Sequence, residues 1–470
     1  MTTHSRLLLH RAELDGRVLD VRVVDASIAE ISTRLAARPG EEVLDARGGA
    51  LLPGLCDHHL HLHALAAAQH SAHCGPPAVT GPEALAEALA HAESDEHGWV
   101  RGVGYSEDVA GALDSTGLDL LHAERPVRVQ HRSGALWMVN TAGARALGLD
   151  RSGHPGVERD ARAQPTGRLW RADDWLRARL PGARFPDLRA VGSRLARLGI
   201  THLTDATPDL DATAIGAIGS AMRSGALPQR VHLLGAPLGW TAPGGPRSPA
   251  AGPYKIVLAD SALPGLDALT DRIRAAHAAG RAVAVHCVTR EALVLLLVAL
   301  EGAGVRAGDR IEHAALVPAE LIGRLRDLGP AVVTQPGFLA DRGDDYLRDV
   351  PAADRADLYR ARSLIDAGVP CALSSDAPYG PVDPWTVIDA AVRRRTPSGR
   401  IAGAAERLTG RGALHAYLGS PGDPGGAPRL IAPGAPADLV LLRVPRAEAL
   451  ARPSAGLVAA TVIAGAIWWA

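Results

Sequence analysis

The sequence contains almost no lysine. Lysine and arginine together number 50, and Lys255 is the only lysine among them. Lysine is normally one of the commoner residues, so arginine has been used here wherever a plain cation suffices. Arginine stays protonated in proteins, whereas a buried lysine can lose its proton and react as an amine. Lys255 is therefore predicted to occupy a position where the chemistry of arginine fails.

Other scarcities exclude whole classes of protein. The chain has four cysteines without the spacing of a metal or redox pair, which indicates reduced cytosolic thiols and not a disulfide framework. The longest apolar run, Leu293–Leu300, is too short to cross a bilayer, and the first residues lack the apolar stretch of a secretory signal. The formal charge of −1 gives no electrostatic attraction for nucleic acid or an anionic membrane. We therefore expect a cytoplasmic protein that binds a small-molecule substrate, with homo-oligomer formation left open.

The rest of the composition is typical of a globular α/β protein. Hydrophobic residues make up 47% and charged residues 21% of the 470 positions. Apolar strand-like runs alternate with helical segments, which predicts a (β/α)8 TIM-type barrel, although a doubly wound open sheet shares this alternation. The eight strand-like runs are Leu51–Leu62, Ile200–Ala206, Arg230–Leu234, Tyr254–Ala259, Ala282–Val288, Arg310–Leu316, Ala331–Gln335 and Pro370–Ser374. The helical segments are Asp187–Leu198, Leu266–Ala279, Glu291–Ala303, Pro318–Leu328 and Asp357–Ala367.

Three regions fall outside this repeat. Residues 1–50 and 425–470 contain short alternating strands, among them Leu19–Val24 and Ala437–Leu442. Because chain ends often lie close together, we expect these two segments to form one composite β-sandwich. Residues 51–424 would form the barrel. Residues from about 75 to 190 are too many for a connection between two barrel strands, and we interpret them as an insertion with its own strand at Val127–His131.

Residues able to bind metal ions gather at the ends of the predicted barrel strands. Side chains two apart in a strand face the same way, so His59 and His61 share one face of Leu51–Leu62. The carboxyl ends of barrel strands meet at one mouth. Imidazole and carboxylate groups are ligands that suit zinc and its neighbours. The candidate ligands at these ends are His59, His61, Lys255, His286, His313 and Asp376.

Lys255 fits this group of ligands only after a chemical change. An ammonium group is a poor metal ligand, but a lysine that has added CO₂ becomes a carbamate, whose two oxygens can bridge two ions. Arginine does not form this group, which accounts for a lysine at this one position. The alternative is a buried lysine in an ion pair, and it is disfavoured because arginine takes such places elsewhere in this chain.

Motifs spread over nearly the whole chain form a set. The first is Leu52-Pro53-Gly54-Leu55-Cys56-Asp57-His58-His59-Leu60-His61-Leu62. The others are Pro126-Val127, Val139-Asn140, Pro165-Thr166-Gly167, Gly199-Ile200-Thr201, Arg310-Ile311-Glu312-His313-Ala314, Gln335-Pro336, Ser375-Asp376-Ala377-Pro378 and Pro436-Ala437-Asp438-Leu439-Val440. Together they resemble the metal-dependent amidohydrolase superfamily, and within it amidohydrolase family 3, the branch of N-substituted formamide deformylase-like proteins.

This resemblance implies a barrel, a composite β-sandwich and a divalent metal centre. By the family pattern, His59, His61 and Asp376 would bind one ion. His286 and His313 would bind a second ion, with carbamylated Lys255 between the two. Two zinc ions are therefore the expected cofactor, although other first-row metals suit the same ligands.

The chain departs from this branch around the expected substrate site. The branch often has Gly-His before Val-Asn, where this chain has Ser133-Gly134-Ala135, and it often has Gly-Asp-Arg after the fifth-strand histidine, where this chain has Thr289-Arg290-Glu291. Because arginine binds carboxylates with paired hydrogen bonds, Arg290 predicts an anionic or strongly polar substrate, unless a nearby acid pairs with it. Gln335, at the end of the seventh strand, is a further candidate for substrate contact. His131, in the insertion, is another, although exposed loop cations are more often only solvated.

These features predict a metal-dependent hydrolase that cleaves a non-peptide C–N bond, of amide type, in a small molecule. A metal-bound hydroxide would attack the carbonyl carbon, since a bound metal lowers the pKa of water toward about 7. Asp376 would act as the catalytic residue that takes a proton and gives it to the leaving nitrogen. A hydrolase of an ester, lactone or cyclic imide would need the same centre. A non-catalytic barrel that binds a small ligand is the alternative from another class.

Overall fold

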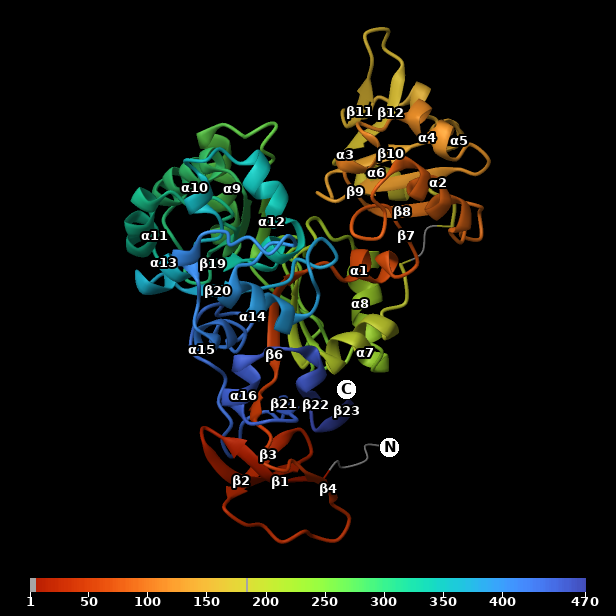
Figure 1. The fold of residues 1–470 in the computed structure, drawn as a ribbon. Coiled ribbons are helices and arrows are strands. Elements are labelled where there is room, and N and C mark those ends of the chain that lie inside the picture. The colour runs from red at the N-terminus through yellow and green to blue at the C-terminus, as the bar shows by residue number, and fades with distance from the viewer. Residues whose placement is uncertain (1–5, 183–184) are drawn as a thin grey trace. The chain divides into compact units, whose positions relative to one another are not determined.

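The computed structural model describes residues 6–182 and 185–470 and shows a mixed α/β chain (Figure 1). The chain divides into two compact units. The larger unit comprises Met1–Leu62 and Asp187–Ala470, and the smaller unit comprises His63–Pro186. The smaller unit overlaps most of the segment predicted as an insertion, about 75–190, but it runs from residue 63 to residue 186.

Parallel strands form the centre of the larger unit. They belong to two sheets, one with the order β15-β14-β13-β6 and one with the order β16-β17-β18-β19-β20. The strands of the first sheet are β6 (Leu55–Leu60), β13 (Ile200–Asp205), β14 (Arg230–Leu233) and β15 (Ala250–Ala251). Those of the second are β16 (Tyr254–Val257), β17 (Val283–Cys287), β18 (Arg310–His313), β19 (Ala331–Thr334) and β20 (Cys371–Leu373). Every residue of β6, β13, β18 and β20 is buried, as expected when helices cover a parallel sheet.

Backbone hydrogen bonds connect the edges of these two sheets. The amide of Lys255 donates to the carbonyl of Leu234 at 3.0 Å, which links the start of β16 to the end of β14. At the other edges, the amide of Asp376 donates to the carbonyl of His59, and the amide of His61 donates to the carbonyl of Ala377, both at 2.8 Å. The last strand in chain order therefore lies beside the first, and we refer to this contact between β20 and β6 as the seam.

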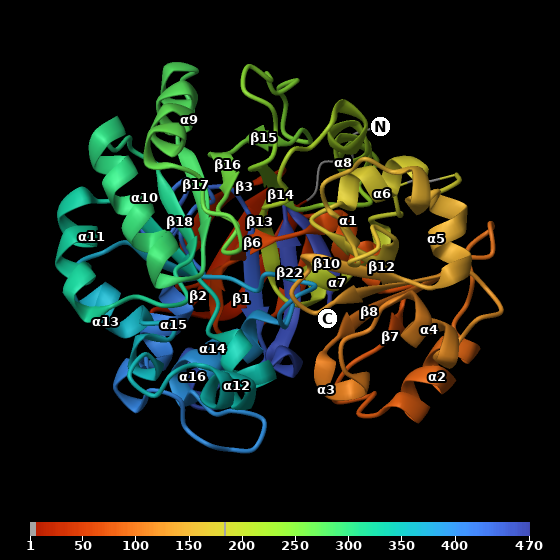
Figure 2. The same cartoon turned by 90° about the horizontal axis from the view of Figure 1, so that it is seen from above.

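Helices follow most of the parallel strands and alternate with them along the chain. Figure 2 shows α9, α10 and α11 on the outside of β17 and β18. The helices of this part are α7 (Arg189–Arg197), α8 (Ala212–Ser224), α9 (Leu266–Ala278), α10 (Arg290–Ala303), α11 (Ile322–Leu328), α12 (Gly337–Asp349), α13 (Ala361–Asp366), α14 (Pro384–Arg393) and α15 (Gly410–His415). Gly199 and Gly368, which end two predicted helices, have φ of 89° and 84°, in the left-handed region that favours glycine.

The predicted strand Leu51–Leu62 is wrong as a single element. It is divided into β5 (Leu51–Pro53), which pairs antiparallel with β21 (Leu439–Leu442), and β6, which pairs parallel with β13. Gly54 separates the two strands and packs against Thr201, whose side chain would lie 2.2 Å from a Cβ at that position. The backbone therefore changes from one sheet to the other at a glycine that no larger residue can replace without a shift.

The terminal segments of the larger unit form two four-stranded sheets, with the orders β3-β2-β1-β4 and β23-β22-β21-β5. Buried residues of both sheets, including Leu9, Val21, Leu51 and Leu439, belong to one hydrophobic cluster. The remaining elements of these segments are β1 (Arg6–Leu14), β2 (Arg17–Val24), β3 (Ser27–Ser32), β4 (Glu42–Asp45), α16 (Arg446–Ala451), β22 (Val458–Ile463) and β23 (Ala466–Trp469). Segments from opposite ends of the chain thus share one core.

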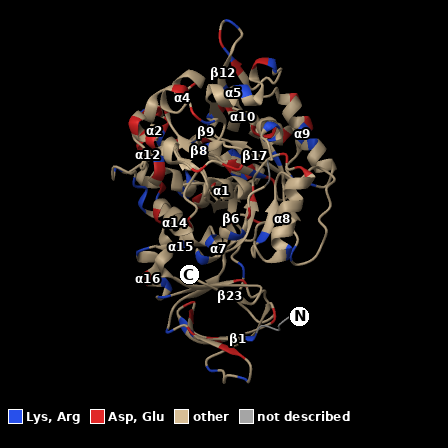
Figure 3. Ribbon diagram, turned by 90° about the vertical axis from the view of Figure 1, so that its right-hand side faces the viewer, with Lys and Arg blue, Asp and Glu red and all other residues tan. Residues whose placement is uncertain are grey.

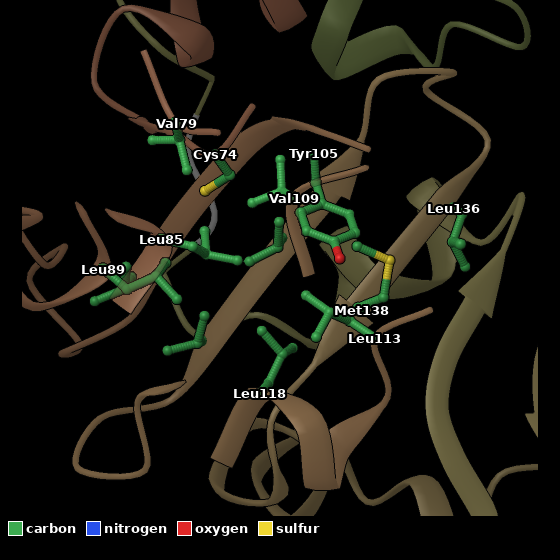
Figure 4. Close-up of a cluster of buried hydrophobic side chains, with 13 residues drawn as sticks. Cys74, Val79, Leu85, Leu89, Tyr105, Val109, Leu113, Leu118, Leu136 and Met138 are labelled. Atoms are coloured by element: carbon green, nitrogen blue, oxygen red, sulfur yellow. The ribbon is translucent and has the colours of Figure 1, made fainter. Parts of the chain in front are cut away.

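The smaller unit has its own six-stranded sheet, with the order β11-β12-β10-β9-β8-β7. One face of this sheet packs on a cluster that includes Leu85, Tyr105, Leu118 and Met138 (Figure 4). The strands are β7 (Ala72–His73), β8 (Val100–Tyr105), β9 (Val127–His131), β10 (Leu136–Val139), β11 (Val157–Arg159) and β12 (Pro165–Trp170). The helices are α1 (Leu62–Ala68), α2 (Pro82–His91), α3 (Glu107–Ala110), α4 (Ser115–Leu121), α5 (Thr141–Leu147) and α6 (Asp173–Arg179).

Charged residues of both signs are distributed along the helices and loops of each unit (Figure 3). In the part of the chain that the structure describes, no helix has the length and apolar character needed to cross a membrane.

Candidate metal centre

Three predicted ligands come together at the seam. His59, His61 and Asp376 each offer a ligand atom, and these atoms lie within 4.8 Å of one another. Nε2 of His61 is 3.2 Å and Nε2 of His59 is 3.5 Å from Oδ1 of Asp376. His59 and Asp376 are buried, and His61 is partly exposed. Two imidazoles and one carboxylate around one point form a typical divalent metal site.

The backbone at the seam holds this arrangement. Asp57 is buried in β6, and its Oδ1 accepts hydrogen bonds from the amides of His59 at 3.1 Å and Ser375 at 3.2 Å. Burial raises the pKa of Asp57 to about 6. Asp376 has φ of 54°, a conformation that residues other than glycine rarely adopt. Strain of this kind persists where the surrounding contacts fix the backbone, and it is common at functional sites.

Neighbouring side chains orient the two imidazoles. Nδ1 of His59 is hydrogen-bonded to Oε2 of Glu312, which is fully buried on β18. Nδ1 of His61 lies 3.2 Å from Oγ1 of Thr207. When a partner occupies one ring nitrogen, the other is presented to the metal. Both histidines therefore direct Nε2 toward Asp376.

The charge distribution also fits a cation at this point. Burial alone would raise the pKa of Asp376, but the hydrogen bond from His61 and the charges of His59 and His313 hold this pKa below its ordinary value. Burial and the nearby Lys255 lower the pKa of His59 well below its ordinary value. Among the described residues, no donor meets full hydrogen-bond geometry at the buried Oδ1 of Asp376, although Nε2 of His61 lies 3.2 Å from it. A buried carboxylate oxygen facing two imidazole nitrogens fits a divalent metal ion.

His286 and His313 lie next to this group. The ring of His313 is 4.8 Å from that of His59 and 4.5 Å from that of His286, between centroids. His313 has φ of 70°, and its Nδ1 is 2.9 Å from Oε1 of Gln335. Gln335, predicted to contact substrate, is fully buried and is anchored by Oγ of Ser374 at 2.9 Å. The position of Gln335 therefore suits the orientation of His313.

Lys255 is buried at the start of β16, within electrostatic range of His59, His313 and Asp376. Burial lowers its pKa to about 8, against the opposing effect of the Glu312 and Asp376 carboxylates. A larger fraction of neutral amine is present near pH 7 than for an ordinary lysine, and a neutral amine is the form that adds CO₂.

His59, His61 and Asp376 are the one group of three or more histidine, cysteine or acidic ligands within the described ranges.

Sequence reasoning did not assign roles to the residues that support the ligands. Glu312 contacts His59 through one carboxylate oxygen and Arg310 through the other, and Nη2 of Arg310 donates to the carbonyl of His58 at 2.7 Å. Asp57 joins the two seam strands. Both acids lie within the quoted motifs, directly beside or two positions from a predicted ligand. An acidic residue next to a ligand, in an otherwise apolar strand, is the signal that could have identified them.

The other two substrate candidates have protein partners. Arg290, at the start of α10, is bonded to Asp354 at 2.5 Å and to Asp357 at 3.3 Å. Two carboxylates therefore balance the charge that was expected to attract an anionic substrate. His131 lies on β9 in the smaller unit, where its Nε2 is 3.0 Å from Glu107 and its Nδ1 is 2.7 Å from Ser133.

Comparison with known proteins agrees with this site. The sequence pattern of the amidohydrolase family matches residues 42–468. The chain is 28% identical over 408 residues to a Bacillus subtilis (strain 168) protein called amidohydrolase YtcJ, covering 76% of each chain. It is 26% identical over 456 residues to the N-substituted formamide deformylase of Arthrobacter pascens, covering 83% of this chain and 82% of the relative.

Solved structures share the fold. A metal-dependent hydrolase from Pyrococcus horikoshii OT3, itself uncharacterised, superposes with a TM-score of 0.72 at 19% identity, covering 93% of this chain and 97% of the other. A triazine hydrolase variant superposes with a TM-score of 0.57 at 15% identity, covering 98% and 94%. Because the family pattern matches nearly the whole chain, this protein belongs to the amidohydrolase family and is a hydrolase that acts on carbon–nitrogen bonds.

Proposed function

We propose that this protein is a metal-dependent hydrolase that cleaves an amide-type, non-peptide C–N bond in a small molecule. The observation that carries this proposal is the convergence of His59, His61 and Asp376 at the seam between β6 and β20. The family of the chain supports the reaction class. We propose only a class of substrate, because relatives at this level of identity differ in the compounds that they cleave.

The proposed architecture is a closed (β/α)8 barrel with a composite β-sandwich. The parallel strands follow one another in chain order, and backbone hydrogen bonds connect both pairs of sheet edges, which supports closure. The carboxyl ends of all these strands would then surround one mouth that contains the ligands. The hydrophobic cluster shared by both terminal sheets supports a single sandwich from residues 1–50 and 425–470.

The ligands proposed for the first ion are His59, His61 and Asp376. His286 and His313 would hold a second ion, with Lys255 as a bridging carbamate. The low pKa of Lys255, about 8, and its burial at the start of β16 support this role. When bound, a divalent metal in such a site acidifies water and polarises a carbonyl group.

Asp376 is proposed as the catalytic residue. Its pKa lies below the ordinary value, so the carboxylate is ionised at neutral pH and can accept a proton. One oxygen of this carboxylate would hold the proton from the attacking water and pass it to the leaving nitrogen. Two backbone hydrogen bonds across the seam fix the position of Asp376, which limits its motion during transfer.

Metal analysis with a substrate panel tests this proposal. The purified enzyme is expected to contain a first-row divalent metal, to lose activity on chelation, and to hydrolyse simple amides faster than matched esters, lactones or cyclic imides. Asp376→Asn should reduce turnover by about 10³-fold or more, because it removes a proton acceptor and a ligand. The Asp260→Asn variant, changed outside the ligand group, serves as a control. Faster hydrolysis of esters or lactones than of amides would replace the amide assignment, and metal-free protein with full activity would contradict the proposal.

A further inference from the structure

Arg342 lies close to the metal centre although no sequence motif points to it. It belongs to α12, which begins two residues after Gln335 and so follows the carboxyl end of β19. The helix is interrupted at Arg342, where φ is −138° and ψ is 25°. The break changes the direction in which this side chain leaves the helix, compared with a regular helical position.

The guanidinium group of Arg342 contacts the turn that carries Asp376. Its Nη2 donates a hydrogen bond to the carbonyl of Tyr379. The amide of Tyr379 donates to the carbonyl of Asp376 at 2.9 Å, and the ring of Tyr379 is 5.4 Å from the ring of His61. One short turn therefore separates Arg342 from two of the three clustered ligands.

Aromatic side chains surround this arginine. The guanidinium carbon is 4.5 Å from the ring centroid of Phe338, and Tyr359 lies within electrostatic range of both Arg342 and Asp376. The whole chain has only 2 phenylalanines and 6 tyrosines. Phe338, Tyr346, Tyr359 and Tyr379 nevertheless gather in one cluster beside the metal ligands. A stacked guanidinium keeps its donor edge available for a planar anion while the ring covers its face.

The hydrogen-bonding capacity of Arg342 is not used up by the protein. Its Nε is buried and has no hydrogen-bond acceptor within the described residues. The carboxylate of Asp341, which is 49% exposed, forms an ion pair with this nitrogen at 3.4 Å but makes no hydrogen bond to it. Arg290 differs, because it already donates to two carboxylates. Of these two arginines, only Arg342 has a buried N–H group, at Nε, that makes no hydrogen bond within the described residues.

We infer that Arg342 binds a carboxylate of the substrate, in a subsite beside the metal centre that Phe338 and Tyr379 flank. This inference rests on the proposed amide hydrolysis and adds a substrate class, namely small amides that carry an acidic group. The guanidinium would bind the carboxylate through Nε and a neighbouring nitrogen, the paired geometry that arginine favours. The proposal keeps the anionic substrate that was predicted from Arg290, but it assigns the binding of the acidic group to Arg342.

The test uses amides that differ only in the acidic group. N-formyl and N-acetyl derivatives of glycine, β-alanine and 4-aminobutyric acid are compared with those of methylamine, ethylamine and propylamine. The three chain lengths vary the distance between the scissile bond and the carboxylate. Wild-type enzyme loaded with metal should prefer the acidic member of at least one pair by about tenfold or more in kcat/KM.

Two variants of Arg342 separate binding from structure. Arg342→Met, which keeps the length of the side chain, should abolish this preference. The readout is the ratio of kcat/KM between acidic and neutral amides, because loss of the hydrogen bond to Tyr379 affects both series alike. Arg342→Lys keeps the charge without the fork and should retain part of the preference. Arg290→Met is the matched control and should leave the preference unchanged. A preference that survives in Arg342→Met, or that disappears in Arg290→Met, overturns the inference.

Calorimetric titration of the same compounds distinguishes the two proposals. Hydrolysis of neutral amides with no preference for the acidic ones overturns the subsite and leaves the proposed function intact. Binding of the acidic compounds that depends on Arg342, without any hydrolysis by metal-loaded enzyme, supports the subsite and contradicts the proposed function. Binding of neither series, or equal binding of both, also overturns the subsite. If Arg342→Met fails to fold, Arg342→Lys decides, since an unchanged preference in that variant contradicts paired binding.

Discussion

Glu312 and His59 lie 253 positions apart in the sequence, yet a carboxylate oxygen of Glu312 is hydrogen-bonded to Nδ1 of His59. The other oxygen of Glu312 accepts a hydrogen bond from Arg310, which in turn donates to the carbonyl of His58. These hydrogen bonds therefore run from His59 through Glu312 and Arg310 to His58, the residue before His59 on β6. Glu312 therefore fixes both the rotation of the His59 ring and the backbone that carries it.

The first prediction concerns this contact. Glu312→Gln should lower metal affinity by about 10- to 100-fold, because the amide orients the imidazole less strongly than a carboxylate and makes it less basic. Metal content after dialysis against a graded chelator series measures this effect. Activity should return when metal is added in excess, and Glu291→Gln, an exposed change on α10, should behave as wild type. Equal metal affinity in both variants would contradict a role for Glu312 in orientation.

The second prediction concerns Lys255. Lys255→Arg should lose the two-ion centre, since a guanidinium does not add CO₂ and repels cations. Lys255→Ala should lose activity as well, and short carboxylic acids should restore part of it by supplying bridging oxygens. Metal per chain and turnover are measured for each protein, with circular dichroism to verify folding. Two ions per chain and near-normal turnover in Lys255→Arg would refute the carbamate.

The third prediction concerns stability in acid. Burial lowers the pKa of His232 from 6.5 to about 4, with a contribution from Arg310. The unfolded chain therefore binds a proton at His232 more readily than the folded chain, and stability falls as the pH drops from about 6.5 to 4. The contribution reaches about 3 kcal/mol at the acidic end of this range. His232→Asn should flatten this part of the pH profile of the urea midpoint, while His91→Asn, at the exposed end of α2, serves as the control.

The fourth prediction concerns the smaller unit. Asn140 is fully buried, and its Oδ1 accepts from the amides of Val127 at 3.0 Å and Gly143 at 2.9 Å. Its Nδ2 donates to the carbonyls of His122 at 3.0 Å and Arg125 at 2.8 Å. Asn140→Ala leaves these backbone groups without partners and should destabilise the unit by about 3 kcal/mol or more. Limited proteolysis of residues 63–186 measures the loss, and Gln164→Ala, at an exposed position, should cause none.

Much of the larger unit could be predicted from local sequence. Each of the apolar runs contains or matches a strand, and the predicted helix Leu266–Ala279 agrees with α9 to within one residue. The clustering of His59, His61 and Asp376 also followed from their places after apolar strands, because parallel strands present their carboxyl ends on one side. The strands, helix α9 and the ligand cluster could be predicted because hydrophobic periodicity and the ends of strands are local properties of the sequence.

The remaining features depend on contacts between residues distant in sequence. The division of Leu51–Leu62 at Gly54 reflects the packing of Thr201, which no pattern within the strand reveals. The partners of Arg290 lie 64 and 67 positions further along the chain, so its neutralisation was not visible from Thr289-Arg290-Glu291. Helix α12 was missed because acidic and basic residues and two glycines obscure its periodicity, and its break at Arg342 belongs to the tertiary structure.

Because its ligands lie on both sides of the seam, a bound ion would stabilise the contact between β6 and β20. β6 comes first and β20 last among the parallel strands, so an ion held by His59, His61 and Asp376 would clasp the two ends of a long loop of chain. At a hundredfold excess over its dissociation constant, such an ion adds about 2.7 kcal/mol to the clasped form. Chelation should therefore speed amide hydrogen exchange first at His61 and Asp376, whose amides bond across the seam, and leave β17 and β18 protected. Loss of the ion would separate β6 from β20 before the rest of the molecule unfolds.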